Sequence, residues 1–330
     1  MKTRALRLLG ARDVCVMDVE RSVPDAFLGV QVELAGVCGS DLHVYRTGEF
    51  VPSFPVTPGH EVVGLVVSPA GGFREGERVV ADSRVPCGTC SQCSAGSAQR
   101  CPDLGFLGEV SDGGFAEHLA IRPSRVFRVP AGLSSRVAVL AEPTAVVLHA
   151  RRRAQSAARR SEVVTVLGAG PIGALQALVL ADATDLVLVE PDPTRRALVA
   201  ALTGREVVAD GRELRRADLV FDCAGFPGSL QGALALVRPG GVVIAVALHH
   251  GHEAIDANGL VAAEATIVGS HVFADEMADA LALLAAQPER FAGVITDSVS
   301  LDELPRALDA AAEGRHRGLK IIVDPVRLGA

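Results

Sequence analysis

The second half of the chain carries a pattern that few folds can accommodate. The apolar segment Val163–Leu167 leads directly into a glycine-rich turn, Gly168–Gly173. Further strand-like segments at Asp185–Glu190, Asp218–Cys223 and Gly241–Ala247 alternate with Ala- and Leu-rich segments of helical length. Strands that are apolar throughout and alternate with helices are typical of a parallel sheet with helices on both faces. We therefore expect an α/β domain with a doubly wound parallel sheet in this half.

The turn has the form G-x-G-x-x-G, between a predicted strand and a predicted helix. In this place Gly168 permits the tight turn, Gly170 lets the backbone approach a pyrophosphate, and Gly173 lets the helix pack closely on the strand. The N–H groups of the helix N-terminus attract phosphate. Incidental glycines are the alternative, but the strand, the turn and the helix together predict a dinucleotide site.

Glu190 ends the second strand, roughly twenty residues after the turn. A carboxylate there accepts hydrogen bonds from both adenosine-ribose hydroxyls and repels a 2′-phosphate, which favours NAD over NADP. Arg195 and Arg196 could instead accommodate that phosphate, and Glu190 could be a helix-start carboxylate only, so NADP stays the less favoured alternative. The predicted cofactor-binding residues are Gly168, Gly170, Pro171, Ile172, Gly173, Glu190 and Arg195.

The first 150 residues have a different texture. Short alternating segments with strand character, among them Val62–Val67 and Arg78–Ala81, are separated by glycine and proline residues, as at Pro52–Pro58. Such segments predict a β-rich domain. After about Ser270, two helices, at Asp275–Ala286 and Leu301–Glu313, precede a last strand, Gly318–Val323.

Four cysteines lie close together in one loop: Cys87, Cys90, Cys93 and Cys101. Four thiolates at such spacing make a closed tetrahedral zinc site, which stabilises a loop that lacks a hydrophobic core. Zinc is preferred over an iron–sulfur cluster because the surrounding fold predicts no electron transfer. Four free surface thiols, the alternative, would be prone to oxidation. We expect a structural zinc site.

A second group of metal-binding side chains is dispersed along the chain. Cys38 and His60 lie in the β-rich half, and Glu142 lies just before the α/β half. A thiolate, an imidazole and a carboxylate can hold zinc and leave one position open for a substrate oxygen. Read singly, Cys38 could be a small core residue, His60 a hydrogen-bonded loop residue and Glu142 a helix-start carboxylate.

The bulk properties exclude several classes of protein. The 330 residues carry a formal net charge of −7, which argues against nucleic-acid and anionic-membrane partners. No long apolar run follows the basic residues near the start, so we expect neither a signal peptide nor a membrane span. We expect a cytoplasmic protein whose seven cysteines are metal ligands or free thiols rather than disulfides.

Taken in order, these motifs resemble the zinc-containing medium-chain dehydrogenase/reductases along essentially the whole chain. Glu142-Pro143 resembles the sorbitol and threonine dehydrogenase branch. The motifs that carry the resemblance, besides the cysteine loop and the glycine-rich turn, are Gly36–His43, Gly59–Glu61, Asp112–Glu117, Ala141–Pro143 and Gly318–Ile322.

The resemblance implies a domain plan. Residues 1–150 would form a GroES-like catalytic domain with the structural zinc lobe at about 85–105, and residues 151–271 a Rossmann NAD-binding domain. Residues 272–330 would return to the catalytic domain. It also implies a homodimer or a homotetramer. One departure is the short segment 209–217, where relatives have a longer helical segment, so contacts to the adenine side are less certain.

The resemblance also implies roles for individual side chains. Cys38, His60 and Glu142 would be the catalytic zinc ligands, and Glu61, next to His60, would be an alternative or exchanging ligand. The sequence does not decide whether Glu61 or Glu142 is the third ligand of the catalytic zinc. The resemblance implies three further roles: Ser40 would hydrogen-bond the substrate oxygen and begin a proton relay, His43 would pass the proton towards solvent, and Asp41 would orient His60.

The sequence therefore predicts reversible oxidation of a secondary alcohol, such as a polyol, a sugar or an aminocyclitol, to a ketone. Hydride would pass to NAD, and each chain would hold two zinc ions. One alternative is a zinc-independent quinone or enoyl reductase of the same fold, which the dispersed ligand set disfavours. Another is a non-catalytic zinc-ribbon binding protein, which Ser40 and His43 disfavour.

Overall fold

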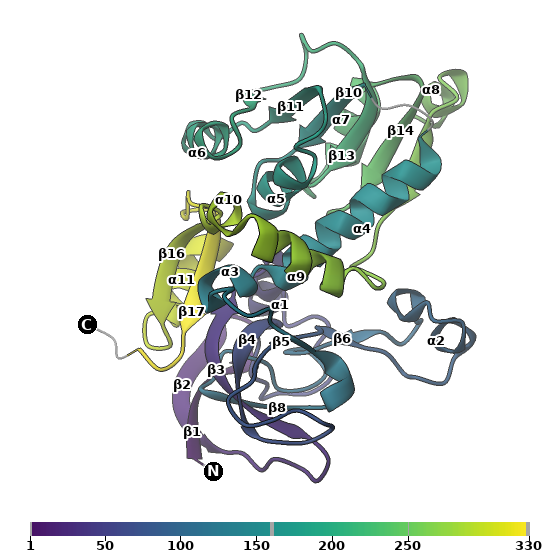
Figure 1. Cartoon of the computed structure of the whole chain (residues 1–330). Helices are drawn as coiled ribbons and strands as arrows, with labels where there is room; N and C mark the ends of the chain where they lie inside the picture. Colours follow the sequence, from purple (N-terminus) through teal and green to yellow (C-terminus); the bar gives the residue numbers. More distant parts are fainter. Residues whose placement is uncertain (1, 159–161, 250, 328–330) are drawn as a thin grey trace. The chain divides into compact units, whose positions relative to one another are not determined.

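The computed structural model describes residues 2–158, 162–249 and 251–327 (Figure 1). The chain forms two compact units. Unit 1 comprises Met1–Glu142, Met277–His316 and Lys320–Ala330, and unit 2 comprises Pro143–Glu276 and Arg317–Leu319. The division at 142/143 falls within helix α4 (Ala141–Ala157), eight residues before the division expected at 150/151. In the described ranges no helix combines the length and the apolar character that a bilayer span requires.

Unit 1 is built on a seven-stranded, largely antiparallel sheet. Its central pair, β3 (Leu28–Gly36) and β4 (Glu61–Ser68), is antiparallel and sets Gly36 opposite Glu61. The other strands are β5 (Arg78–Ala81), β8 (His118–Ile121), β9 (Val126–Arg128), β16 (Ile295–Ser300) and β17 (Lys320–Asp324). Because β16 and β17 join this sheet, the last part of the chain completes the unit that the first part begins.

A hairpin, β1 (Lys2–Gly10) and β2 (Asp13–Glu20), adds to the same unit. Its inward residues Leu6 and Leu8 enter a core that also contains Val32, Phe115 and Val323. Besides two single-turn 3-10 helices, the remaining elements of unit 1 are α1 (Gly39–Thr47), β6 (Arg84–Val85), α2 (Ser91–Ser94), β7 (Gly105–Phe106), α3 (Ser135–Ala138), α9 (Met277–Ala286), α10 (Pro288–Ala292) and α11 (Leu304–Ala312).

Unit 2 contains the predicted parallel sheet, with strand order β12-β11-β10-β13-β14-β15. Every neighbouring pair is parallel, and the order reverses direction between β10 (Val163–Leu167) and β13 (Ala217–Asp222). This is the doubly wound Rossmann order, so the predicted fold class is confirmed. The other strands are β11 (Asp185–Val189), β12 (Glu206–Val208), β14 (Val237–Ala245) and β15 (Thr266–Gly269).

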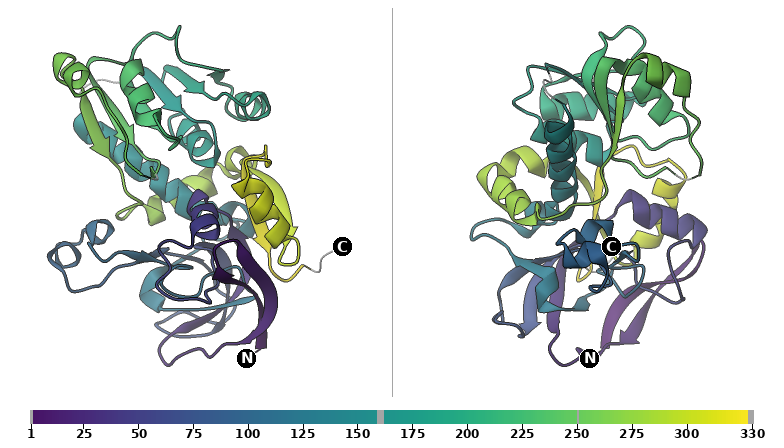
Figure 2. Two further views of the ribbon diagram at one scale, coloured as in Figure 1. Left: turned by 180° about the vertical axis from the view of Figure 1, so that it is seen from behind. Right: turned by 90° about the vertical axis from the view of Figure 1, so that its right-hand side faces the viewer.

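Alternation along β10 explains why helices cover both faces of this sheet (Figure 2). Val164 and Val166 point to one face, where they pack with residues of α4 and α5 (Pro171–Val179). Val163 and Leu167 point to the other, where they pack with Ala233 of α7 (Ser229–Leu236). A strand buried on both faces favours apolar residues at nearly every position, which is the pattern seen in the sequence. Two further helices are α6 (Pro193–Thr203) and α8 (Ala257–Ala262).

Candidate metal and nucleotide sites

The N-cap and the first half of α1 hold four of the predicted site residues: Cys38, Ser40, Asp41 and His43. Cys38 is the N-cap, and Asp41 Oδ2 accepts a hydrogen bond from the Cys38 backbone N–H at 2.8 Å. This contact leaves the other oxygen of Asp41 free to face His60, whose Nδ1 lies 3.4 Å from Asp41 Oδ1. Ser40 and His43 are three residues apart on the helix, so they share one face.

Cys38, His60 and Glu61 come together in space. One ligand atom from each lies within 4.8 Å of the others. The pairing of β3 with β4 explains the place of Glu61, because its opposite residue is Gly36. A Cβ atom at Gly36 would lie 1.9 Å from Glu61 Oε2, so the carboxylate occupies space that only glycine leaves open.

Lys320, at the start of β17, neutralises part of the charge of Glu61. Its Nζ donates to Glu61 Oε1 at 2.6 Å and to the Val37 carbonyl at 3.0 Å, and both charged side chains are buried. Burial acts to lower the pKa of Lys320, but attraction to Glu61 and Cys38 raises it overall. Among the described residues Glu61 Oε2 has no hydrogen-bond partner. One oxygen of the carboxylate is therefore held by Lys320, and the other is available to a ligand.

Glu142, the other predicted third ligand, is not in this group of three. It lies buried in the first turn of α4, and its Oε1 accepts a hydrogen bond from Ser83 Oγ at 2.8 Å. Burial, which the charge of Glu61 reinforces, raises the pKa of Glu142. The geometry thus favours Glu61 over Glu142 as the third ligand, with Glu142 near enough for its charge to be felt.

The site suits a cation. The acidic groups Cys38, Asp41, Glu61 and Glu142 outnumber the basic groups His60 and Lys320. Burial acts to lower the pKa of His60, but Asp41 and Cys38 raise it well above the usual value. A buried excess of acidic groups is costly unless a bound ion compensates it. Thiolate, imidazole and carboxylate are the donors that a catalytic zinc site with an open position uses, so the residues fit zinc.

His43 leads from this region to the surface. Its Nε2 lies 2.8 Å from Glu49 Oε2, and the exposed side-chain fraction rises from 5% at His43 to 62% at Glu49. Thr47 Oγ1 donates to the His43 carbonyl at 2.9 Å and accepts from the Glu49 backbone N–H at 3.1 Å. A buried imidazole is thereby joined to a carboxylate in contact with water.

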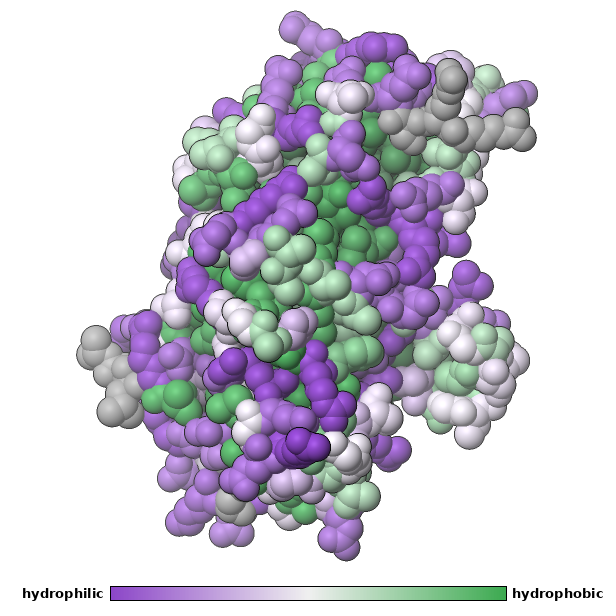
Figure 3. Space-filling model, viewed as in Figure 1, coloured by the Kyte–Doolittle hydropathy of each residue, from purple (hydrophilic) through white to green (hydrophobic). Residues whose placement is uncertain are grey.

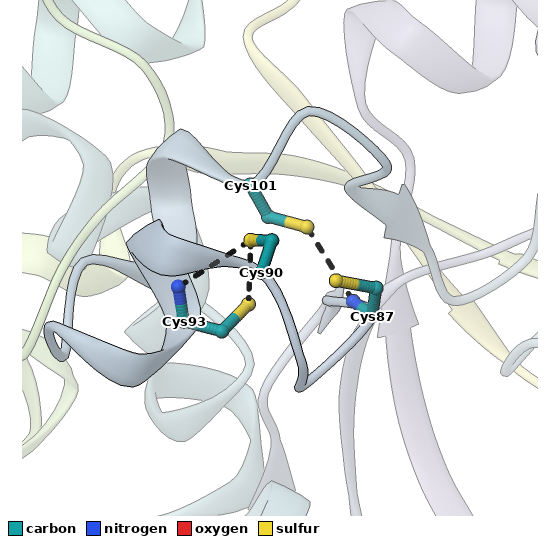
Figure 4. Close-up of side chains that lie close together, drawn as sticks. All are labelled: Cys87, Cys90, Cys93 and Cys101. Carbon is teal, nitrogen blue, oxygen red and sulfur yellow. Dashed lines mark hydrogen bonds between the residues drawn. The ribbon is translucent and has the colours of Figure 1, made fainter.

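The four cysteines of the lobe converge on one point (Figure 4). Their sulfur atoms lie within 4.8 Å of one another. Cys90 caps α2 and accepts from the Cys93 N–H, and the N–H groups of Thr89 and Cys90 lower the pKa of Cys87 to about 6. Within the lobe, Cys101 is the one buried hydrophobic residue. The surface of the lobe has mostly pale colours in Figure 3, which mark intermediate hydropathy. A loop with so little core depends on a bound ion for its shape, and these thiols fit zinc.

In unit 2 the glycine-rich turn has the geometry that a pyrophosphate requires. A Cβ at Gly168, whose φ is 89°, would lie 2.9 Å from Ala224 Cα, and a Cβ at Gly173 would lie 1.9 Å from the Gly168 carbonyl oxygen. Both positions therefore need glycine. Gly170 differs, because a Cβ there would meet open space. It is the N-cap of α5, with Pro171 in the first turn, so a phosphate can approach its backbone.

Glu190 lies beside this turn. Its Oε2 accepts from the Ala169 N–H and its Oε1 from the Asp192 N–H, both at 3.0 Å. The Arg196 guanidinium donates to the carbonyls of Glu190 and Pro191. Arg195 Nε approaches the Gly318 carbonyl at 3.4 Å. The carboxylate is thus fixed next to the turn, as the prediction of a ribose-binding group requires.

Sequence reasoning did not identify Lys320, Ser83 or Glu49. Of these three, Lys320 is the one that its sequence position could have identified, because a charged residue at the start of an apolar, buried strand needs a partner of opposite charge. Ser83 and Glu49 are ordinary polar residues of loops, and only their contacts with Glu142 and His43 distinguish them.

Known proteins resemble the chain over nearly its whole length. A family model described as alcohol dehydrogenase GroES-like domain matches residues 25–131, and one described as zinc-binding dehydrogenase matches residues 171–286. A sorbitol dehydrogenase of Bacillus subtilis (strain 168) is 30% identical over 319 residues, which cover 90% of each chain. A D-altritol 5-dehydrogenase of Agrobacterium fabrum is 32% identical over 301 residues, covering 86% of this chain and 88% of that one.

Among solved structures, a zinc-binding dehydrogenase from Sinorhizobium meliloti 1021 bound to NADP superimposes with a TM-score of 0.88 at 27% identity. The match covers 98% of this chain and all of that one. It extends the resemblance from the two family models to the complete fold of both units.

Proposed function

The chain belongs to the zinc-dependent medium-chain dehydrogenase/reductase family, and on that premise we propose that it oxidises a secondary alcohol of a polyol, sugar or aminocyclitol reversibly to a ketone. It is an NAD(P)-dependent oxidoreductase of the alcohol and polyol dehydrogenase type. The polar substrate class is supported by the sorbitol and altritol dehydrogenases among its relatives.

The observation that carries the proposal is the group formed by Cys38, His60 and Glu61, with Glu61 Oε2 buried and unpartnered among the described residues. We assign these three as ligands of a catalytic zinc, and Cys87, Cys90, Cys93 and Cys101 as ligands of a structural zinc. Glu142 is assigned a place beside the catalytic zinc rather than on it, because it is not in the group of three whose ligand atoms lie within 4.8 Å of one another.

When bound, zinc supplies Lewis-acid polarisation of the substrate oxygen, and the nicotinamide supplies the acceptor for the hydride. The side chains of α1 then carry the proton. Ser40 accepts the proton of the substrate hydroxyl while its own hydroxyl proton passes to His43, on the same helix face. Glu49 takes it from His43 Nε2 at the surface. Asp41 holds the ring of His60 through Nδ1.

Unit 2 binds the dinucleotide in this proposal. Gly168, Gly170 and Gly173, with Pro171 and Ile172 at the start of α5, hold the pyrophosphate, and Glu190 accepts from the ribose hydroxyls. Glu190 favours NAD over NADP, and the ratio of kcat/KM for the two cofactors measures this preference directly. We also propose Arg195 as a contact on the adenosine side.

We propose a homodimer or homotetramer in the cytoplasm, with a small-molecule alcohol or ketone as substrate. Light scattering of the purified protein in solution measures its mass and so the number of chains in the assembly.

The test is zinc analysis combined with an activity screen. We expect about two zinc ions per chain and NADH formation with polyols, sugars or aminocyclitols. Cys38→Ser should abolish turnover and leave NAD affinity nearly intact. A folded, active protein without zinc, or activity that survives complete chelation, would contradict the proposal and favour a zinc-independent reductase.

A further inference from the structure

Glu109 is a half-buried carboxyl group that the proposed mechanism does not use. Within the described residues, no hydrogen bond or ion pair joins its side chain. Four other acidic groups that are buried or partly buried in the same unit differ in this respect, because each has a donor: Asp82 pairs with Arg84, Asp112 with Arg7, Glu61 with Lys320, and Glu142 with Ser83. A carboxylate that loses part of its hydration without a partner in the protein is poorly compensated.

The turn that carries Glu109 is fixed against the metal-site residues. A Cβ at Gly108 would lie 2.7 Å from the Gly59 nitrogen, so the turn touches the residue that precedes His60. On its other side, the Leu107 N–H donates to the Ser83 carbonyl at 2.8 Å, and Ser83 in turn donates to Glu142. The two residues before Glu109 therefore contact Gly59, which precedes His60 in the chain, and Ser83, which donates a hydrogen bond to Glu142.

The electrostatics agree with this position. Burial raises the pKa of Glu109 to about 7, with His60 acting to lower it and Asp41 to raise it. The charges of two metal-site residues thus reach its carboxyl group. The proton path along α1 ends at Glu49 and leaves Glu109 without a role in proton transfer.

We propose that Glu109 determines substrate specificity by accepting a hydrogen bond from a hydroxyl or ammonium group that the substrate carries near the carbon to be oxidised. This inference rests on the proposed function and specifies which substrates fit it. A half-buried acceptor without a partner disfavours analogues that lack the donor. It also repels a substrate carboxylate, so polyols and amino-polyols fit, whereas aldonates do not.

A matched substrate series tests the assignment. Sorbitol offers hydroxyl groups, 1-amino-1-deoxysorbitol adds an ammonium group, gluconate adds a carboxylate, and 2-butanol offers the reacting hydroxyl alone. The zinc-loaded wild type is compared with Glu109→Gln, which keeps the shape and removes the charge, and with Glu109→Leu. Glu75→Gln, at an exposed position of the same unit, controls for net charge. Zinc content and melting temperature identify any variant that has lost its fold.

We expect Glu109→Gln to lower kcat/KM about 10- to 100-fold for the amino-polyol and about 2- to 10-fold for sorbitol, as the loss of a charged acceptor requires. The kcat/KM of Glu109→Gln for 2-butanol should differ from that of wild type by less than about twofold, and its kcat/KM for gluconate should be higher than that of wild type. An equal loss on all four substrates, or no change on any, overturns the assignment. Wild type that oxidises 2-butanol better than sorbitol and the amino-polyol also overturns it. Wild type that oxidises no alcohol contradicts the proposed function itself.

Discussion

Lys320 Nζ lies 2.6 Å from Glu61 Oε1, and both side chains are buried in unit 1. The pair joins the start of β17 to the start of β4, 259 residues apart in the sequence. It holds the Glu61 carboxylate in one orientation, with Oε2 turned to the space that Gly36 leaves open. The ion pair thus orients the carboxylate that we propose as a metal ligand, besides its effect on stability.

Replacing Lys320 with Met should leave Glu61 buried without its counter-charge. Removing one partner of a buried ion pair costs about 3–5 kcal/mol. We expect Lys320→Met to lower the free energy of unfolding, measured with urea, by an amount in that range. Lys2→Met, at an exposed position of β1, is the control and should have no measurable effect. Equal stability of the two variants would show that Lys320 does not compensate Glu61.

Gly36→Ala tests the space beside Glu61. The new Cβ would lie 1.9 Å from Oε2 and would displace the carboxylate, so we expect the catalytic zinc to be lost and activity with it. Gly39→Ala is a matched control, because a Cβ there meets nothing within 4 Å. Zinc content per chain and kcat should both fall in the first variant and stay near wild type in the second. A fully active Gly36→Ala would refute the placement of Glu61.

Glu49→Gln tests the proton path. Glutamine keeps the size of the side chain but cannot accept the proton that His43 passes on, so we expect kcat to fall about 10-fold in dilute buffer. Raising the concentration of a small buffer such as imidazole should restore the rate, because it replaces the missing acceptor. Zinc content and KM should not change. A rate that is independent of buffer and equal to wild type would exclude Glu49 from the path.

Much of the fold could be predicted from local pattern, because the relevant information is local. Strand β10 is apolar at nearly every position since both of its faces are covered, and Gly168 and Gly173 are required by contacts within one turn. The cysteine lobe is equally local, since its four sulfur atoms come from one loop. Fold class and family were therefore predicted correctly.

The third ligand of the candidate metal site could not be predicted from the sequence, because its position depends on pairing between distant strands. The choice between Glu61 and Glu142 turns on the register that sets Gly36 opposite Glu61, and on the bond from Ser83 to Glu142. Neither contact has a signature at short range. The same holds for Lys320, whose partner is supplied by the other end of the chain, and for Glu109, which is distinguished by the partner that it lacks.

The stability of unit 2 should fall at low pH because the Glu276 carboxylate becomes protonated. Burial acts to raise the pKa of Glu276, but its contact with His149 at 2.8 Å and its backbone N–H donors lower it to about 2. A lowered pKa stabilises the fold fully above the unfolded value, 4.5, and this contribution is lost as the pH falls from 4.5 to 2. The difference between the two pKa values corresponds to about 3 kcal/mol, and screening by solvent reduces it to the order of 2 kcal/mol.

The measurement is the melting temperature of wild type and of Glu276→Gln as a function of pH. The difference between them should be largest near neutral pH and should shrink below pH 4.5, since the wild-type carboxylate is then protonated. Glu213→Gln, an exposed position in unit 2, should show no such convergence. A constant difference between wild type and Glu276→Gln would contradict the lowered pKa.

The identity of the third catalytic ligand is tested most directly by counting zinc in Glu61→Gln and Glu142→Gln. If Cys38, His60 and Glu61 hold the ion, Glu61→Gln retains about one zinc per chain, the structural one, and forms no NADH with any alcohol. Glu142→Gln then keeps about two zinc ions and a reduced rate. Two zinc ions and activity in Glu61→Gln, with loss of one zinc in Glu142→Gln, would contradict the assignment of Glu61.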